Sequence, residues 1–237
     1  MKIAIVIPTY DRYKKLSRCI NSILQNTYQD FVIYPMCDNN DIDTYKKVNE
    51  ANFPQTYPVF CNKQLYAPGC WNSFSANFYI CFNWDAMLWL CDDTELRVDT
   101  LEKAVDCFIK NYPDTDGMMG IAQWYPKETS YCKSGQSILG RKFLARFPKQ
   151  QSCCPDYLFA HQDAELMEFA LSINKFAFCD STDIIHYHPS FYPDEMDSTH
   201  ALSRGDIVRN DKITRKIRQE KGLVWGKTWQ LVNNFRR

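Results

Sequence analysis

Apolar residues in the first half of the chain come in short runs bounded by turn residues. Residues 2–8, 31–36 and 87–91 are dominated by apolar side chains and are too short for independent helices. These runs predict three buried strands. A further strand is expected near residues 57–61.

Amphipathic segments separate these runs. After the first strand, five apolar residues share one helical face, with Lys and Arg opposite: Tyr13, Leu16, Ile20, Ile23 and Leu24. Helices are also expected over residues 44–50, ahead of the 87–91 strand, and over residues 101–108. This alternation predicts an α/β fold with a mostly parallel central sheet and helices on both faces.

The second half of the chain is less regular. Strands are expected over residues 118–124 and 176–185, and a helix is expected to open at Asp163. Residues 126–156 contain a long polar and aromatic stretch, which predicts a loop that is either functional or partly disordered. We expect one domain over residues 1–200, followed by a basic helical extension over residues 201–237.

Charge is unevenly distributed along the 237 residues, although the net charge is zero. From residue 201 onward, ten Lys and Arg stand against three Asp and Glu, so this tail is +7 and the first 200 residues are −7. Two interpretations stay open. The tail is either a solvated basic helix or a patch for a polyanion, such as nucleic acid or a membrane surface.

The eleven cysteines are odd in number and include no CxxC pair. With no signal peptide at the start, they favour free thiols in a reducing compartment over a disulfide framework. No stretch approaches the roughly 20 apolar residues needed to cross a bilayer. We therefore expect a soluble, cytoplasmic protein.

Polar residues follow three of the predicted strands. Thr9 and Tyr10 come after the first strand, Asp38 after the second, and the Asp92–Asp93 doublet after the 87–91 strand. Ligands of open parallel sheets bind outside the carboxyl ends of the strands. These residues are therefore expected to converge on one crevice.

The Asp92–Asp93 doublet has two interpretations. Adjacent carboxylates repel and raise one another's pKa, and a hard cation such as Mg²⁺ removes that penalty while also binding phosphates. Alternatively, Asp92 or Asp93 caps a helix that continues through Val98, Leu101 and Val105.

Five segments together resemble the family 2 glycosyltransferases, enzymes of the GT-A fold that use nucleotide-diphospho-sugars. In chain order they are residues 5–12 (IVIPTYDR), 37–41 (CDNND), 90–94 (LCDDT), 162–166 (QDAEL) and 186–189 (HYHP). They span residues 5–189, about four fifths of the chain, and their order and spacing carry the resemblance. The resemblance implies a Rossmann-like GT-A domain with a nucleotide-binding half over residues 1–95 and an acceptor half over residues 96–200.

The resemblance also implies how a donor would bind. Tyr10 would lie against the base, and Asp38 would accept a hydrogen bond from the N3–H of uracil or thymine, which favours a UDP-linked donor. Asp92 would contact the ribose or a metal. The implied donor-binding residues are Pro8, Thr9, Tyr10, Arg12, Asp38, Asn72 and Asp92.

Metal binding and catalysis follow from the same resemblance. Asp93 would bind the Mn²⁺ or Mg²⁺ that bridges the two phosphates, with His186 or His188 completing the coordination, since imidazole favours Mn²⁺. Asp163 would act as the general base on the acceptor hydroxyl. Attack opposite the leaving nucleotide implies inversion through an oxocarbenium-like transition state.

Each assignment has a structural alternative. Tyr10 could be a rim aromatic, Asp38 an Asx-turn residue, and Asp163 a helix cap. Histidines such as His186 and His188 are commonly structural.

The chain also departs from the family pattern. Cys91 stands where members often carry an acid, Trp71 where they carry an arginine before Asn72, and Gln162 where they carry Glu. These departures leave Asp163 as the single expected base.

The sequence thus predicts a metal-dependent, inverting glycosyltransferase that uses a nucleotide-sugar donor and a hydroxyl acceptor. The acceptor is a glycan or, following some phage enzymes, a hydroxylated DNA base, for which the basic tail would supply phosphate contacts. The alternative is a non-catalytic module that binds nucleotide sugar or glycan. A nucleotidyltransferase is disfavoured, since the first strand is not followed by a glycine-rich loop.

Overall fold

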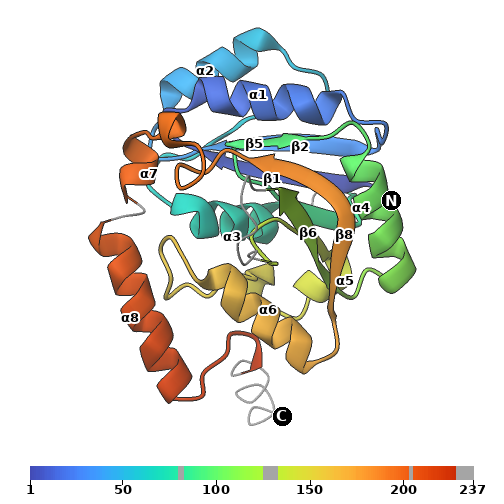
Figure 1. The fold of residues 1–237 in the computed structure, drawn as a ribbon, viewed down its shortest axis with the longest axis vertical. Coiled ribbons are helices and arrows are strands. Elements are labelled where there is room, and N and C mark those ends of the chain that lie inside the picture. The colour runs from blue at the N-terminus through green and yellow to red at the C-terminus, as the bar shows by residue number, and fades with distance from the viewer. Residues whose placement is uncertain (80–82, 125–132, 203–204, 228–237) are drawn as a thin grey trace.

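Figure 1 shows the computed structural model, which describes residues 1–79, 83–124, 133–202 and 205–227. Its strands are β1 (Ile3–Thr9), β2 (Phe31–Cys37), β3 (Val59–Phe60), β4 (Ala86–Trp89), β5 (Thr94–Leu96), β6 (Met118–Trp124), β7 (Ser137–Gly140) and β8 (Phe176–His186). Its α-helices are α1 (Tyr13–Leu24), α2 (Ile42–Ala51), α3 (Tyr66–Phe78), α4 (Thr100–Asn111), α5 (Arg141–Leu144), α6 (Gln162–Ser172), α7 (Ser198–Leu202) and α8 (Asp206–Glu220). Two 3₁₀ turns are η1 (Pro148–Gln150) and η2 (Pro193–Glu195).

The described strands form a single sheet in the order β3-β2-β1-β4-β7-β6-β8-β5. β1 pairs in parallel with β2 and β4, and β2 pairs in parallel with β3. β7 runs antiparallel between β4 and β6, whereas β8 is parallel to β6 and antiparallel to β5. The α/β fold with a mostly parallel sheet is confirmed.

The first strand supplies residues to two hydrophobic cores, because successive side chains of a strand point to opposite faces of the sheet. Ile3, Ile5 and Ile7 pack with buried residues of α1 and α4. Ala4 and Val6 pack with buried residues of α3 and α6. Figure 1 shows α1 and α2 on one side of the sheet and α3 and α6 on the other. Burial of both faces explains why this strand is a continuous apolar run.

The loop expected over residues 126–156 is wrong in part. This stretch contains β7, α5 and η1, while residues 126–132 lie outside the described residues. β7 has four residues, too few to show a periodicity, and pairing with β4 and β6 fixes its place. Position 140, the last of the strand, requires glycine because a Cβ there would lie 1.9 Å from the carbonyl oxygen of Thr115.

β5 is a second strand that the sequence did not indicate, and it decides between the two interpretations of the doublet. It follows Asp93 directly and pairs with β8. The next helix, α4, begins at Thr100, with Asp99 at its N-cap position. The alternative in which Asp92 or Asp93 caps this helix is therefore wrong.

The basic helix α8 is fastened to α6 through a buried carboxylate. Glu165 of α6 is fully buried and accepts hydrogen bonds from Arg218 Nη2 (2.6 Å) and Arg215 Nη1 (3.2 Å). The hydroxyl of Tyr157 and the backbone N–H of Trp225 also donate to it, both at 2.6 Å. Arg215 and Arg218, two of the basic residues of the tail, thus form buried ion pairs, which the sequence pattern did not indicate.

Among the described residues, no helix combines the length and the apolar character needed to span a bilayer. The boundaries proposed at residues 95 and 200 stay predictions.

Replacing Glu165 by Gln removes the negative charge but keeps the size of the side chain. We expect unfolding free energy to fall by about 3–5 kcal/mol near neutral pH, because Arg215 and Arg218 lose their buried partner. Burial raises the pKa of Glu165, but the hydrogen bonds from Arg218, Tyr157 and Trp225 lower it to below its usual value. The wild-type protein should therefore lose this stability as the pH falls through the acid range, whereas the variant should show a flatter acid limb.

Chemical denaturation of both proteins, at pH values spaced about one unit apart from pH 3 to pH 8, measures both effects. Lys216→Gln is the matched control, since its pair with Glu220 is exposed and should contribute within about 0.5 kcal/mol. Equal stability of Glu165→Gln and the control would contradict the assignment.

Candidate functional site

A cavity of about 400 Å³ lies at the carboxyl ends of β1, β2 and β4. The structure brings ten of the eleven sequence-predicted site residues to its wall. They are Pro8, Thr9, Tyr10, Arg12, Asp38, Asp92, Asp93, Asp163, His186 and His188. Residues that are distant in the sequence, and that were predicted to serve the donor, the metal and the acceptor, thus share one cavity.

Asp92 faces inward and joins the ends of β1 and β4. Its Oδ2 accepts a hydrogen bond from Thr9 Oγ1 (2.8 Å), and its Oδ1 accepts one from Arg12 Nη1 (2.6 Å). Burial raises the pKa of Asp92 to about 6, although the charge of Arg12 opposes that rise. Both of its oxygens are engaged by protein groups, so its first role in this structure is to hold the two strand ends together.

Asp93 is equally buried, but its two oxygens differ. Oδ2 lies 2.8 Å from His200 Nε2 and 3.2 Å from Arg12 Nη2. Oδ1 makes no hydrogen bond within the described part of the chain and lies 3.3 Å from His186 Nε2. Burial disfavours the charged form, but His186, His200 and Arg12 hold the pKa of Asp93 well below its usual value. The carboxylate is therefore ionised, with Oδ1 facing His186.

His186 is oriented by a neighbour from β6. Its Nδ1 lies 2.8 Å from the amide oxygen of Gln123, and because that oxygen only accepts, Nδ1 carries the proton. In the neutral ring, the lone pair of Nε2 then faces Asp93 Oδ1. Two acceptors 3.3 Å apart repel unless a cation or a proton lies between them. The sulfur of Cys91 completes a cluster whose donor atoms all lie within 4.8 Å of one another.

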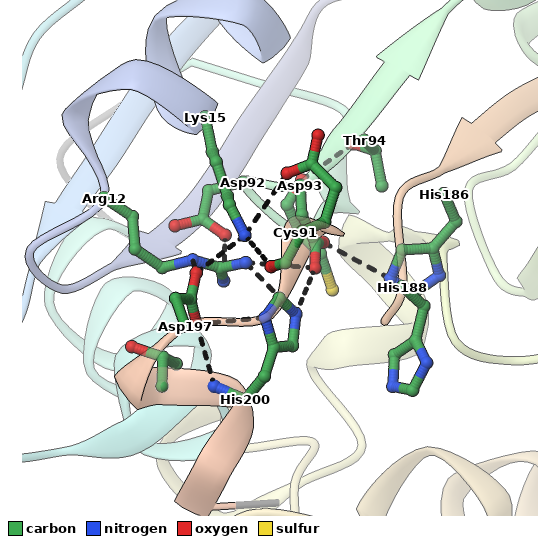
Figure 2. A network of polar contacts seen from close by, with 12 residues as sticks. Arg12, Lys15, Cys91, Asp92, Asp93, Thr94, His186, His188, Asp197 and His200 are labelled. Carbon is green, nitrogen blue, oxygen red and sulfur yellow. Dashed lines mark hydrogen bonds and ion pairs between the residues drawn. The ribbon is translucent and has the colours of Figure 1, made fainter. Parts of the chain in front are cut away.

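Residues 193–202 contact α1 through Glu195 and Asp197, which pair with Lys15. Figure 2 shows the side chain of His200 pointing toward Asp93. Asp197 accepts hydrogen bonds from Arg12 Nε (3.0 Å) and forms an ion pair with Lys15 Nζ (2.7 Å). Its other oxygen accepts the backbone N–H of His200 at 2.9 Å. These contacts fix α7 against the start of α1.

The sequence analysis did not identify His200 or Asp197. The ring centroid of His188 lies 5.6 Å from that of His186 and 5.8 Å from that of His200, so three imidazoles gather beside Asp93. The Asp-x-x-His spacing is a local signal, because an Asp before a short helix holds the N–H three residues later. Its link to Asp93, 107 residues away, is not visible in the sequence.

Asp38 is held by the start of α3. Its two oxygens accept the backbone N–H groups of Leu65 and Tyr66, each at 2.8 Å. Burial raises the pKa of Asp38, while these hydrogen bonds oppose the rise. The carboxylate shapes the cavity wall at residues 64–67, and its predicted contact with a base stays a prediction.

Asp163 lines the opposite side of the cavity at the second residue of α6. Its Oδ2 accepts a hydrogen bond from Ser134 Oγ at 3.1 Å. His161, with a left-handed φ of 71°, holds the N-cap position of this helix. Asp163 therefore does not occupy the cap position that the structural alternative requires.

Asn72 is the one predicted site residue that does not line the cavity. Its amide donates to the carbonyl of Cys153 (2.8 Å) and accepts from the N–H of Cys153 (2.9 Å). Both polar ends are used within the core, which corrects its assignment to donor binding. Its neighbour Trp71 does line the cavity, stacked on Trp89 with centroids 4.7 Å apart.

No protein-family model and no curated protein sequence matches the chain. Several solved structures do match the chain. Residues 1–349 of S. aureus TarS superimpose with a TM-score of 0.61 and 14% identity, over 84% of this chain and 68% of that fragment. The same part of TarS with UDP-GlcNAc bound gives 0.57 and 14%, over 78% and 58%.

Two further structures carry other donors. The mannosyltransferase PcManGT from Pyrobaculum calidifontis, with GDP-Man and Mn²⁺, gives a TM-score of 0.60 and 11% identity, over 79% of this chain and 57% of that chain. GalNAc-T7, with UDP, GalNAc and Mn²⁺, gives 0.59 and 10%, over 78% and 43%. The chain spans less than two thirds of both. At these identities the comparisons show a shared GT-A-like fold.

Replacing Arg12 by Gln tests whether this guanidinium holds the site together. We expect unfolding free energy to fall by about 3–5 kcal/mol near neutral pH, because buried Asp92 and Asp93 lose their cation. The pKa of Asp92 is higher in the folded protein than in the unfolded chain, where it is about 4. A group of this kind lowers stability only at pH values above its pKa in the unfolded chain. The loss should therefore be larger at about pH 8 than at about pH 5, where Asp92 becomes neutral.

Denaturant titrations at both pH values measure the difference between the variant and the wild type. Lys14→Gln on the same helix is the control, since Lys14 is exposed. A loss that does not depend on pH would show that Asp92 is not the group affected.

Proposed function

We propose that this protein is a metal-dependent, inverting glycosyltransferase that transfers a sugar from a UDP-linked donor to a hydroxyl acceptor. One observation carries the proposal: Asp93, His186, Asp38 and Asp163 face the same cavity of about 400 Å³. Cavities of this size bury most of a drug-sized ligand. A shared fold with TarS bound to UDP-GlcNAc supports a nucleotide-sugar donor.

The residues beside Asp93 fit a divalent metal. Asp93 Oδ1 and His186 Nε2 face one another at 3.3 Å, and a cation between them removes their repulsion. His188 lies next to His186 as a further nitrogen donor, whereas His200 Nε2 lies 2.8 Å from Asp93 Oδ2. Mixed oxygen and imidazole ligands favour Mn²⁺ over Mg²⁺. When bound, the metal would offset the charge that develops on the departing diphosphate.

The donor nucleotide is proposed to occupy the β1–β2 side of the cavity. Tyr10 is 37% exposed at the rim, where its ring is accessible to the face of a base. Each oxygen of Asp38 accepts one N–H bond, and a carboxylate has about four acceptor sites. One of these sites suffices for the N3–H of uracil. Thr9 and Asp92 lie between this subsite and Asp93.

Asp163 is proposed to take the proton from the acceptor hydroxyl. It projects from the first turn of α6 and lines the cavity. Ser134 Oγ donates a hydrogen bond to its Oδ2 and so orients the carboxylate. Attack from the side of Asp163, opposite the leaving diphosphate, inverts the sugar carbon.

The acceptor is proposed to be a glycan hydroxyl or, as the second choice, a hydroxylated DNA base. The exposed basic residues of α8, including Arg209, Lys212 and Lys216, are the group that would contact phosphates. Duplex DNA binding that weakens steeply with salt would select DNA. Absence of binding at low salt would select the glycan.

A screen of nucleotide sugars for hydrolysis with and without Mn²⁺ tests donor and metal together. We expect slow, Mn²⁺-dependent hydrolysis of a UDP-sugar without an acceptor. Asp93→Asn should lower it by about 100-fold or more, since a ligand contributes at least as much as the groups that orient ligands. Asp99→Asn, an exposed carboxylate after β5, is the control. Undiminished hydrolysis by Asp93→Asn at saturating Mn²⁺ would exclude the metal assignment.

Asp163→Asn should keep the affinity for UDP and lose transfer. A general base contributes about 10²–10⁴-fold, so kcat should fall by that factor while UDP binding, measured by calorimetry, stays unchanged. Asp180→Asn on β8 is the control, since Asp180 is exposed. Equal transfer by both variants would overturn the base assignment. Binding of UDP-sugar by the wild type without turnover would instead favour the non-catalytic module.

A further inference from the structure

A second group of potential ligands lies behind the cavity wall, away from the histidines. The sulfurs of Cys61 and Cys70 and a carboxylate oxygen of Asp38 all lie within 4.8 Å of one another. All three residues are buried, with exposures of 7%, 0% and 5%. Nothing in the proposed transfer reaction requires the two thiols.

Backbone contacts fix the arrangement of these three residues. Cys61 follows β3, and its N–H donates to the carbonyl of Cys37 (2.9 Å) while its own carbonyl accepts from Asn40 (2.9 Å). Cys70 lies on α3, whose start is held by the carboxylate of Asp38. Three elements of the fold therefore present one donor atom each to the same point.

We propose that Cys61, Cys70 and Asp38 form a site for a thiophilic divalent cation of the Zn²⁺ class. Zn²⁺ takes thiolate and carboxylate ligands in tetrahedral geometry, and Zn–S bonds of about 2.3 Å place two sulfurs about 3.8 Å apart. The present spacing exceeds this by no more than about 1 Å, a shift that side-chain rotation supplies. Both thiols release their protons to solvent on binding, and a water from the cavity takes the fourth position.

The chemistry of the donors separates this site from the one at Asp93. Soft thiolates select Zn²⁺ or Cd²⁺, whereas Mn²⁺ and Mg²⁺ prefer oxygen and imidazole.

Asp38 belongs to this site and also to the nucleotide subsite. If the carboxylate of Asp38 binds a cation, it is a weaker acceptor for the N3–H of uracil. Resting on the proposed function, we expect Zn²⁺ and UDP to weaken one another's binding, by equal factors as linkage requires.

The test is a Cd²⁺ titration of the reduced full-length protein, read out by the ultraviolet sulfur-to-cadmium charge-transfer absorbance. We expect a saturable band that Zn²⁺ displaces and excess Mn²⁺ does not. Cys61→Ser and Cys70→Ser should each lose most of it, with circular dichroism confirming that they fold. Cys107→Ser on α4 is the matched control, since Cys107 belongs to neither group of ligands. It should keep the band.

Three outcomes overturn the proposal. They are the absence of a band in the wild type, a band that survives in Cys61→Ser and Cys70→Ser, and a Cys61–Cys70 disulfide found by mass spectrometry in protein handled under reducing conditions. If the band depends on Cys61 and Cys70 but UDP does not compete with the metal, the cation site stands. Asp38 is then not the residue that accepts the hydrogen bond of the nucleotide base. Failure of the metal site and failure of the proposed function are thereby distinguished.

Discussion

The site depends on one buried guanidinium. Arg12 forms ion pairs with Asp92, Asp93 and Asp197, which follow β4 and β8 and would repel one another without a cation between them. Arginine suits this place because its planar fork offers five donors and keeps its charge when buried. Through these contacts α7 is held against α1, and His200 is delivered to Asp93. The residues of this ion-pair network therefore also form part of the cavity wall.

A second buried carboxylate organises the opposite wall. Asp211 of α8 accepts the backbone N–H groups of three successive residues, Leu158, Phe159 and Ala160, and the last two line the cavity. Glu165 joins the same helix to α6, two residues after Asp163. The helix α8 thus supports the part of the cavity wall formed by residues 159–163. The buried charges of α8 take part in this packing, and its exposed charges face outward, where a partner would bind.

The cavity borders two groups of ligands with different chemical preferences. Carboxylate and imidazole at Asp93 suit a cation that also binds phosphate, whereas the thiols beside Asp38 suit a softer ion. Parallel pairing brings Asp38, Cys61 and Asp93 to the carboxyl edge of the sheet, because β2, β3 and β4 all end there. The second sulfur, that of Cys70, comes from α3.

The sequence by itself determined the strands with long apolar runs, the alternation with amphipathic helices, and the acidic residues that follow β1, β2 and β4. These are local patterns, and parallel pairing makes the strand ends meet. Only the tertiary structure decided the short strands β5 and β7, the inward turn of Asn72 onto Cys153, and the place of His200 beside Asp93. The reason is that each depends on partners tens of residues away, and periodicity along the chain carries no record of which distant group a side chain will meet.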